Sequence, residues 1–177
     1  IIIPEGATVN LFLNNHTISY IIADGNPYWQ CEGIYGIINY GTLNIYSGSS
    51  KTPGNNDKGA IVVRTVLNAK PKESGTIAYQ RVEAIQNHGN LTVNKNVNVT
   101  AEVQFNFQRT DATGQYDRDA SITAAVAGVY NTNDSAVSSI NGAKISATAA
   151  TASVNADFGG IGGKDFSVSN SFAYCVY

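Results

Sequence analysis

The densest group of side chains that could do chemistry lies between positions 111 and 119. It includes Asp111, Asp117 and Asp119. Because alternate side chains of a β-strand share a face, Asp117 and Asp119 would lie together and could bind calcium or an acidic sugar. Polysaccharide cleavage commonly uses paired carboxylates. The adjacent Thr113 and Gly114 favour the simpler interpretation, a solvated loop.

A second group of candidate residues is aromatic. Tyr28 and Trp29 follow an Asp-Gly-Asn turn, and Trp29 is the only tryptophan. Aromatic rings exposed on one face can stack against sugars, so a carbohydrate contact at Tyr28 and Trp29 is one hypothesis. Packing in the core or at a chain corner is the alternative. Further tyrosines lie near these two in the sequence, at Tyr20, Tyr35, Tyr40 and Tyr46.

Metal and cofactor sites are not predicted. His16 and His88, the only histidines, are 72 positions apart, and each stands beside an asparagine in a turn sequence. A metal centre needs more convergent ligands than two such residues supply. The Gly-x-Ser-x-Gly signature of serine hydrolases is absent, as is a phosphate-binding loop. No catalytic residue is therefore assigned.

Composition excludes two classes of partner. The chain has 177 residues, of which 43% are hydrophobic and only 14% charged, with a formal net charge of -2. Binding of nucleic acid or anionic membrane requires a concentrated basic surface, which this balance does not provide. No run of about 18 apolar residues could insert as a helix into a bilayer. Polarity comes mainly from short uncharged side chains, including 20 asparagines.

The chain repeats itself around a hydrophobic triplet that is usually followed by asparagine. Three copies end at Asn39, Asn87 and Asn131, and a fourth ends the chain at Tyr177. The third triplet position recurs at intervals of 48, 44 and 47 residues. Residues 39–45 align with residues 87–93 without a gap, which places Gly41 opposite Gly89. The copy after Asn131 fits only with a short insertion.

The segments between these anchors have a period of two, which is typical of β-strands. The clearest is residues 97–107, where apolar and polar side chains alternate. Residues 8–13, 17–22 and 60–67 are rich in β-branched and aromatic residues and also predict strands. No segment has a convincing amphipathic helical pattern. The predicted class is all-β.

A long repeat of short strands favours a solenoid over a sandwich or a propeller, because stacked coils place equivalent residues above one another. An inward asparagine can then donate to one neighbour and accept from the other. A unit of about 46 residues covers either two coils or one coil with a long excursion. In the first case the three asparagines would not touch. Cys31 and Cys175 fall at different phases of the repeat, too far apart for a disulfide.

Two segments resemble right-handed parallel β-helix repeats of bacterial cell-surface proteins, the pectate-lyase-like and adhesin-like group. They are Ile3-Pro4-Glu5-Gly6-Ala7-Thr8-Val9-Asn10-Leu11-Phe12-Leu13-Asn14-Asn15-His16-Thr17-Ile18 and Ile38-Asn39-Tyr40-Gly41-Thr42-Leu43-Asn44-Ile45. That group commonly has Asn-Gly where this chain has Asn14-Asn15. The resemblance implies an extracellular location and a stacked fold, and it assigns no catalytic residue.

Residues 1–177 are accordingly expected to form a single β-helix segment of a longer repeat protein. The expected function is that of an extracellular stalk, adhesin or filament element at the cell surface. It would associate end to end or continue into further repeats, and it could contact a glycan or a host surface. The alternatives are a polysaccharide lyase or hydrolase acting through Asp117 and Asp119, or a carbohydrate-binding module using Trp29.

Overall fold

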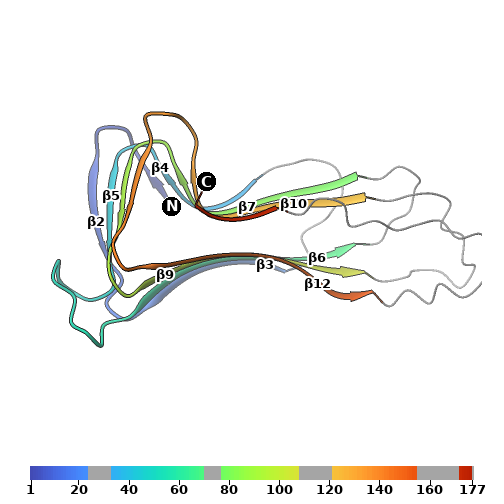
Figure 1. The fold of residues 1–177 in the computed structure, drawn as a ribbon, viewed down its shortest axis with the longest axis horizontal. Helices are drawn as coiled ribbons and strands as arrows, with labels where there is room; N and C mark the ends of the chain where they lie inside the picture. Colours follow the sequence, from blue (N-terminus) through green and yellow to red (C-terminus); the bar gives the residue numbers. More distant parts are fainter. Residues whose placement is uncertain (24–32, 70–76, 108–120, 155–171, 177) are drawn as a thin grey trace, which may run out of the picture.

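The computed structural model describes residues 1–23, 33–69, 77–107, 121–154 and 172–176. These residues contain β-strands and no helix, so the all-β class is confirmed. The strands form three parallel sheets, one of five strands and two of four. In Figure 1 the strands of each sheet nearly overlap in the view, so the three sheets appear as three groups of ribbons.

The chain visits the three sheets in the same order on every pass. Sheet A contains β1 (Ile2–Ile3), β4 (Ile34–Asn39), β7 (Ile77–Asn87), β10 (Ser121–Asn131) and β13 (Phe172–Val176). Sheet B contains β2 (Thr8–Phe12), β5 (Thr42–Tyr46), β8 (Asn90–Val93) and β11 (Val137–Ile140). Sheet C contains β3 (Thr17–Ala23), β6 (Gly59–Ala69), β9 (Val97–Phe107) and β12 (Lys144–Val154). Each strand pairs in parallel with the strand three places earlier, an arrangement compatible with a β-solenoid.

The strand pairing follows the sequence alignment in sheets A and B. Asn39 pairs with Asn87, and Asn87 pairs with Asn131. Beyond these asparagines, Leu43 pairs with Leu91. Each interval between asparagines therefore contains one pass through the three sheets, which resolves the question that the repeat length left open. The number of residues in one pass depends on the sheet. In sheet C, Ile61 pairs with Val99, and fewer residues separate these two than separate Asn39 from Asn87.

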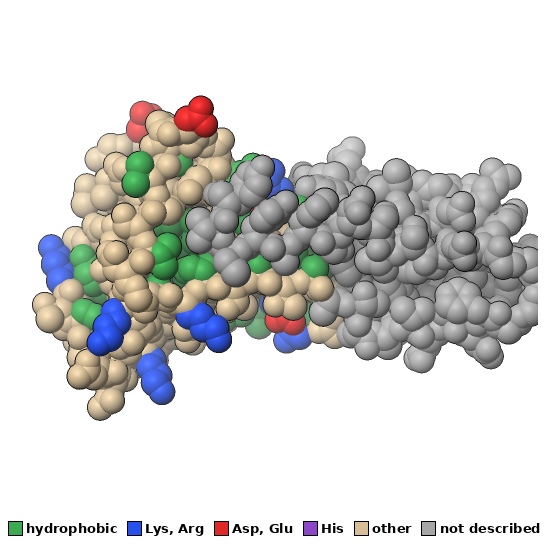
Figure 2. Space-filling model, in the orientation of Figure 1, with side chains coloured by type: hydrophobic (Ala, Val, Ile, Leu, Met, Phe, Trp, Pro, Cys, Tyr) green, Lys and Arg blue, Asp and Glu red, His purple; other side chains and the backbone are tan. Residues whose placement is uncertain are grey.

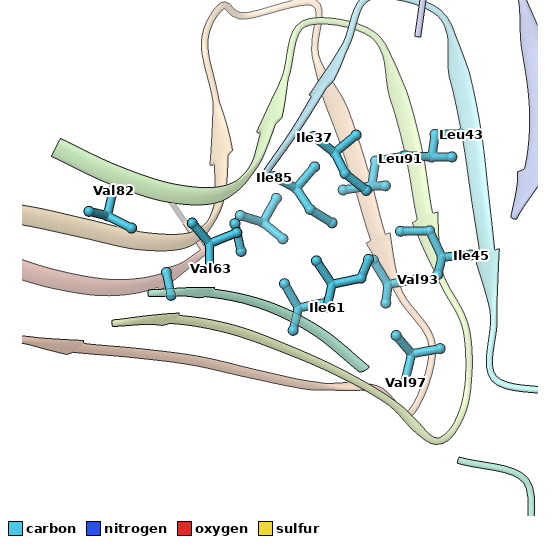
Figure 3. Close-up of a cluster of buried hydrophobic side chains, with 14 of the residues drawn as sticks. Ile37, Leu43, Ile45, Ile61, Val63, Val82, Ile85, Leu91, Val93 and Val97 are labelled. Carbon is cyan, nitrogen blue, oxygen red and sulfur yellow. The ribbon is translucent and has the colours of Figure 1, made fainter. Parts of the chain in front are cut away.

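The core lies between the inner faces of the sheets and follows the period of two. In β9, Val97, Val99, Ala101 and Val103 are buried, whereas the polar residues between them are not. Figure 3 shows side chains from all three sheets meeting in this core. Full burial of one such aliphatic side chain contributes roughly 1.5–3 kcal/mol. The labelled residues are Ile37, Val82 and Ile85 from sheet A, Leu43, Ile45, Leu91 and Val93 from sheet B, and Ile61, Val63 and Val97 from sheet C.

Sheet A bends where its strands have small residues. Val82 and Ile85 both belong to the core although they are three positions apart, so the alternation of faces breaks between them. Gly36 and Ala84 lie at this break. A Cβ atom on Gly36 would lie 2.4 Å from Val63 Cγ2 and 2.7 Å from the Ala84 carbonyl oxygen. The close approach excludes a larger residue. In Figure 1, β7 and β10 run along sheet A and then curve toward the turn that leads to sheet B.

Three of the four turns from sheet B to sheet C share a left-handed residue. Asn15 and Asn96 both have φ of 65°, and Gly142 has φ of 72°. The strand register places these residues at equivalent points before β3, β9 and β12. Asparagine tolerates this backbone conformation better than other residues with a Cβ atom. The substitution of Asn15 for the glycine of the surface-protein pattern is therefore compatible with the same turn.

Thr65 offers a stability prediction, because it is fully buried and its Oγ1 has no hydrogen-bond partner. An unpaired buried hydroxyl costs free energy that an apolar group of the same shape does not. Replacing Thr65 with valine is expected to raise the free energy of unfolding by about 1 kcal/mol. Chemical denaturation measures the change. Thr92→Val, at a half-buried position of β8, serves as control, and equal effects at both positions would contradict the explanation.

Candidate functional site

The most regular polar feature is a ladder of amides inside the turn from sheet A to sheet B. Asn39 and Asn87 are buried, and Asn39 Nδ2 donates to Asn87 Oδ1 at 2.7 Å. Asn87 Nδ2 donates in turn to Asn131 Oδ1 at 3.0 Å. The residues in the ladder are 48 and 44 positions apart in sequence. A primary amide suits this position because it has both a donor and an acceptor.

The same asparagines also fix the backbone of the turn. Asn39 Oδ1 accepts from the amide of Gly41 at 3.2 Å, and Asn87 Oδ1 accepts from the amide of Gly89 at 3.3 Å. The glycines leave no room for a side chain, since a Cβ atom on Gly89 would lie 2.2 Å from the carbonyl oxygen of Gly41. The five predicted turn residues thus form one structural unit that joins three successive passes of the chain.

A second group of side chains lies on the outer side of sheet A, around its bend. We call it the corner row: Tyr40, Arg81, Glu83, Gln86, His88, Tyr130 and Thr132. At one end, the rings of Tyr40 and His88 stack with centroids 4.4 Å apart. His88 Nε2 lies 3.1 Å from Gln86 Oε1, and His88 Nδ1 lies 2.7 Å from Thr132 Oγ1. Both ring nitrogens of His88 are therefore held in place.

The other end of the corner row is an ion pair beneath an aromatic ring. Arg81 Nε bonds to Glu83 Oε1, and the Arg81 guanidinium carbon lies 4.4 Å from the centroid of Tyr130. Tyr130 is paired with Gln86, not with Arg81, so the two side chains meet across the bend of the sheet. The side chain of Arg81 is 31% exposed and that of Glu83 only 2%.

Burial controls the electrostatics of Glu83. Desolvation raises the pKa of this carboxyl above its ordinary value, although the hydrogen bond and the charge of Arg81 and a hydrogen bond from Gln86 act in the opposite direction. The second carboxylate oxygen, Oε2, is buried and has no hydrogen-bond partner. A carboxylate in this position is poorly compensated, because burial without a full set of partners disfavours the charged form.

This carboxyl is expected to make stability fall as pH rises. With a higher pKa in the folded state, the folded protein binds the proton more tightly than the unfolded chain does. Its contribution is thus complete below the unfolded pKa, about 4.3, and is lost as pH rises through the folded pKa. Glu83→Gln removes this dependence. Denaturation of both proteins between pH 4 and 8 measures the effect. As pH rises, the free energy of unfolding of the variant should increase relative to that of the native chain. A relative decrease would mean that the ion pair with Arg81 dominates.

The sequence-predicted contacts fall partly outside the described residues. Tyr28, Trp29, Asp117 and Asp119 lie in segments that the structure does not describe, as does Cys31. The four tyrosines near Trp29 in sequence do not gather on one face. Tyr20 is in sheet C and Tyr46 in sheet B, where Tyr46 stacks on Phe12, whereas Tyr35 and Tyr40 belong to sheet A or follow it.

Sequence reasoning missed the pair of Arg81 and Glu83. One signal was available: two charged residues flank Val82 in a chain that is otherwise poor in charge. Among the described residues no group of three or more histidine, cysteine, aspartate or glutamate side chains could hold a metal ion. The described part also contains no helix that is long and apolar enough to cross a membrane.

Comparisons with known proteins define no class for this chain. No protein-family model matches it, and neither a curated protein nor a solved structure is significantly similar.

Proposed function

We propose that the chain is a segment of a right-handed parallel β-helix that serves as an extracellular structural or adhesive element, such as a stalk, adhesin or filament at the cell surface. The observation that carries the proposal is the asparagine ladder, which links three successive passes through direct amide contacts. A ladder of this kind extends with each added coil. Such an element functions through stiffness and length, and needs no active site.

The packing of the end layers supports extension by repetition. Core-facing residues of the outer strands are only partly buried, although they pack against the fully buried cluster. A further layer on either side would remove this apolar surface from water. These residues are Val9, Leu11 and Ile18 at the β2 and β3 edge, and Ile140, Ile145 and Ala147 at the β11 and β12 edge.

The outer surface is also suited to such a role. In the part of the chain that the structure describes, Figure 2 shows backbone and side chains that are neither charged nor hydrophobic over most of the visible face, with a small number of acidic and basic side chains among them. The face drawn has no dense basic patch among these residues. Contacts through hydrogen bonding and short-range packing are therefore favoured over electrostatic attraction.

Electron microscopy of the natural material, combined with intact mass spectrometry, tests the proposal. We expect elongated rods or filaments, or a parent chain longer than 177 residues with further copies of the Asn-x-Gly repeat. The rods should lengthen with the number of coils, since each coil adds about 4.8 Å. Compact monomers with the mass of this chain, 18.7 kDa, and with capped end layers would contradict the proposal.

The enzymatic alternative makes a separate prediction. A polysaccharide lyase or hydrolase would need carboxylates that converge around Asp117 and Asp119, which lie outside the described residues. Release of reducing ends from plant and bacterial polysaccharides, abolished by Asp117→Ala and Asp119→Ala, would favour the enzyme over the structural element.

A further inference from the structure

We propose that Asn141 is a site of spontaneous deamidation, which converts its side chain to a carboxylate while the asparagine ladder is spared. Asn141-Gly142 is the only Asn-Gly sequence in the chain, and it lies in the turn between β11 and β12. Both residues are exposed. The proposal is independent of the structural function, whose test depends on particle shape and chain length.

The reaction needs only the chain itself and water. The backbone nitrogen of Gly142 loses its proton and attacks Cγ of Asn141, so that a new C–N bond closes a succinimide ring. The Cγ–Nδ2 bond breaks, and the side-chain nitrogen takes up the proton and leaves as ammonia. Water then opens the ring at either carbonyl carbon, which gives aspartate or isoaspartate. The net change is the loss of ammonia and the addition of water, without oxidation or reduction.

The local structure leaves both reacting groups accessible. Gly142 has no Cβ atom to obstruct the attack, and a glycine backbone changes conformation at little cost. Its φ is 72°, at the position that Asn15 and Asn96 occupy in the equivalent turns. Among the described residues, the Gly142 amide has no hydrogen-bond acceptor and the side chain of Asn141 has no hydrogen-bond partner. No hydrogen bond has to break before the ring closes.

The same reaction is blocked at the asparagine ladder. There the attacking nitrogen would belong to the next residue in the chain, and each of these nitrogens already donates a hydrogen bond to a carbonyl oxygen of the preceding pass. The bonds run from Tyr40 to Ile3 at 2.9 Å, from His88 to Asn39 at 2.8 Å and from Thr132 to Asn87 at 3.0 Å. The contacts within the ladder also hold the side-chain amides in place. Backbone pairing therefore protects these asparagines.

The equivalent turn before β3 provides an internal comparison. Asn14 is exposed, as Asn141 is, and it is followed by Asn15. The Asn15 amide, however, donates to the carbonyl oxygen of Ser47 at 3.0 Å, and Asn15 has a side chain where Gly142 has none. An exposed asparagine in this type of turn is thus not sufficient for the reaction.

Isoaspartate at position 141 would change the main chain of the turn. It adds one carbon atom to the backbone between β11 and β12. The Asn141 amide donates to the Val93 carbonyl oxygen at 2.8 Å, and the Gly142 carbonyl oxygen accepts from the Asn96 amide at 3.3 Å. Both hydrogen bonds join this turn to the preceding pass and would have to adjust. The change is local, because the ladder at Asn39 and Asn87 belongs to another turn.

Incubation of the full chain in warm, mildly alkaline buffer, followed by peptide mass spectrometry, tests the proposal. We expect Asn141 to convert about tenfold faster than Asn14 or the ladder asparagines, because only its neighbour is an unhindered glycine. The rate should rise with pH, since the attacking nitrogen must lose a proton. Gly142→Asn should slow the conversion about tenfold and keep the turn, because asparagine tolerates this φ. A Cβ atom at Gly142 would lie 3.7 Å from its nearest neighbour, Lys95 Cγ.

The same incubation in denaturant separates the effect of the fold from that of the sequence. Unfolding releases the backbone amides of His88 and Asn15, so conversion of Asn87 and Asn14 should accelerate, whereas that of Asn141 should change little. The proposal is overturned if Asn141 stays intact in the folded chain, or if Asn87 or Asn14 converts there as fast. It is also overturned if denaturant accelerates Asn141 as strongly as Asn87, or if Gly142→Asn leaves the rate unchanged.

Discussion

Replacing Asn87 with aspartate is expected to lower the free energy of unfolding on the order of 4 kcal/mol at neutral pH. The two side chains have the same shape, but aspartate has no amide donor. Besides the Ser138 hydroxyl at 3.3 Å, Asn87 Nδ2 faces three carbonyl-type oxygens, the side-chain oxygen of Asn131 and the backbone oxygens of Gly89 and Val137, at 3.0, 3.0 and 3.1 Å. In the variant, a carboxylate oxygen would replace this nitrogen and would face those oxygens without a hydrogen atom between them, in a fully buried position.

The control for this change is Asn44→Asp. Asn44 Nδ2 also donates to an asparagine on the neighbouring strand, Asn10, at 3.2 Å, but this pair is exposed. Water can solvate the new carboxylate there, so we expect a loss below about 1 kcal/mol. Urea denaturation of both variants measures the difference. The Asn87→Asp variant should recover part of its stability as pH falls toward 4, because a buried carboxyl that faces acceptors takes up a proton more readily in the folded state than in the unfolded chain. Equal losses in the two variants would mean that the buried ladder contributes little.

Replacing Gly89 with alanine is expected to cost about 3 kcal/mol, through steric conflict and not through polarity. The added Cβ would lie 2.2 Å from the carbonyl oxygen of Gly41 and 2.9 Å from that of Tyr40. Both atoms belong to backbone, which cannot move aside as the end of a side chain can. The turn would have to shift away from the preceding pass, which would weaken the bond from the Gly89 amide to Asn87.

Gly54→Ala is the matched control for the change at Gly89. The atom nearest to a Cβ on Gly54 would be a carboxylate oxygen of Asp57, at 3.6 Å, which is ordinary van der Waals contact. The expected change is within about 0.5 kcal/mol. Thermal unfolding of the two alanine variants would separate the effects. A variant at Gly89 as stable as the one at Gly54 would show that the passes are less closely stacked than described.

Local periodicity was sufficient to predict four of the thirteen strands. The predicted strand at residues 97–107 is β9, and the predicted segments at 8–13, 17–22 and 60–67 match β2, β3 and β6 closely. Two Ala-rich stretches, at 120–127 and 147–152, fall largely in β10 and β12, in agreement with the absence of a helical prediction. These features depend on neighbouring residues alone, which is why the sequence reveals them.

Alignment of the repeats predicted which turn residues are equivalent, but not that they touch. The distance between Asn39 and Asn87 depends on the path that the chain takes through three sheets, and two path lengths fitted the same spacing. The corner row was harder still to predict. Arg81 and Tyr130 meet because sheet A bends at its small residues, and no local pattern in the sequence encodes that bend.

A disulfide between neighbouring passes tests the central claim, that one pass through the three sheets separates equivalent residues. Thr42 and Asn90 are paired on adjacent strands β5 and β8. Strand spacing of about 4.8 Å lies within the range of Cα separations that a disulfide allows. With Cys31 and Cys175 replaced by serine, Thr42→Cys with Asn90→Cys should oxidise to a cross-linked peptide that mass spectrometry detects. Thr42→Cys with Val137→Cys, one strand further along, should not. Failure of the first pair, or equal cross-linking of both, would contradict the stacked arrangement.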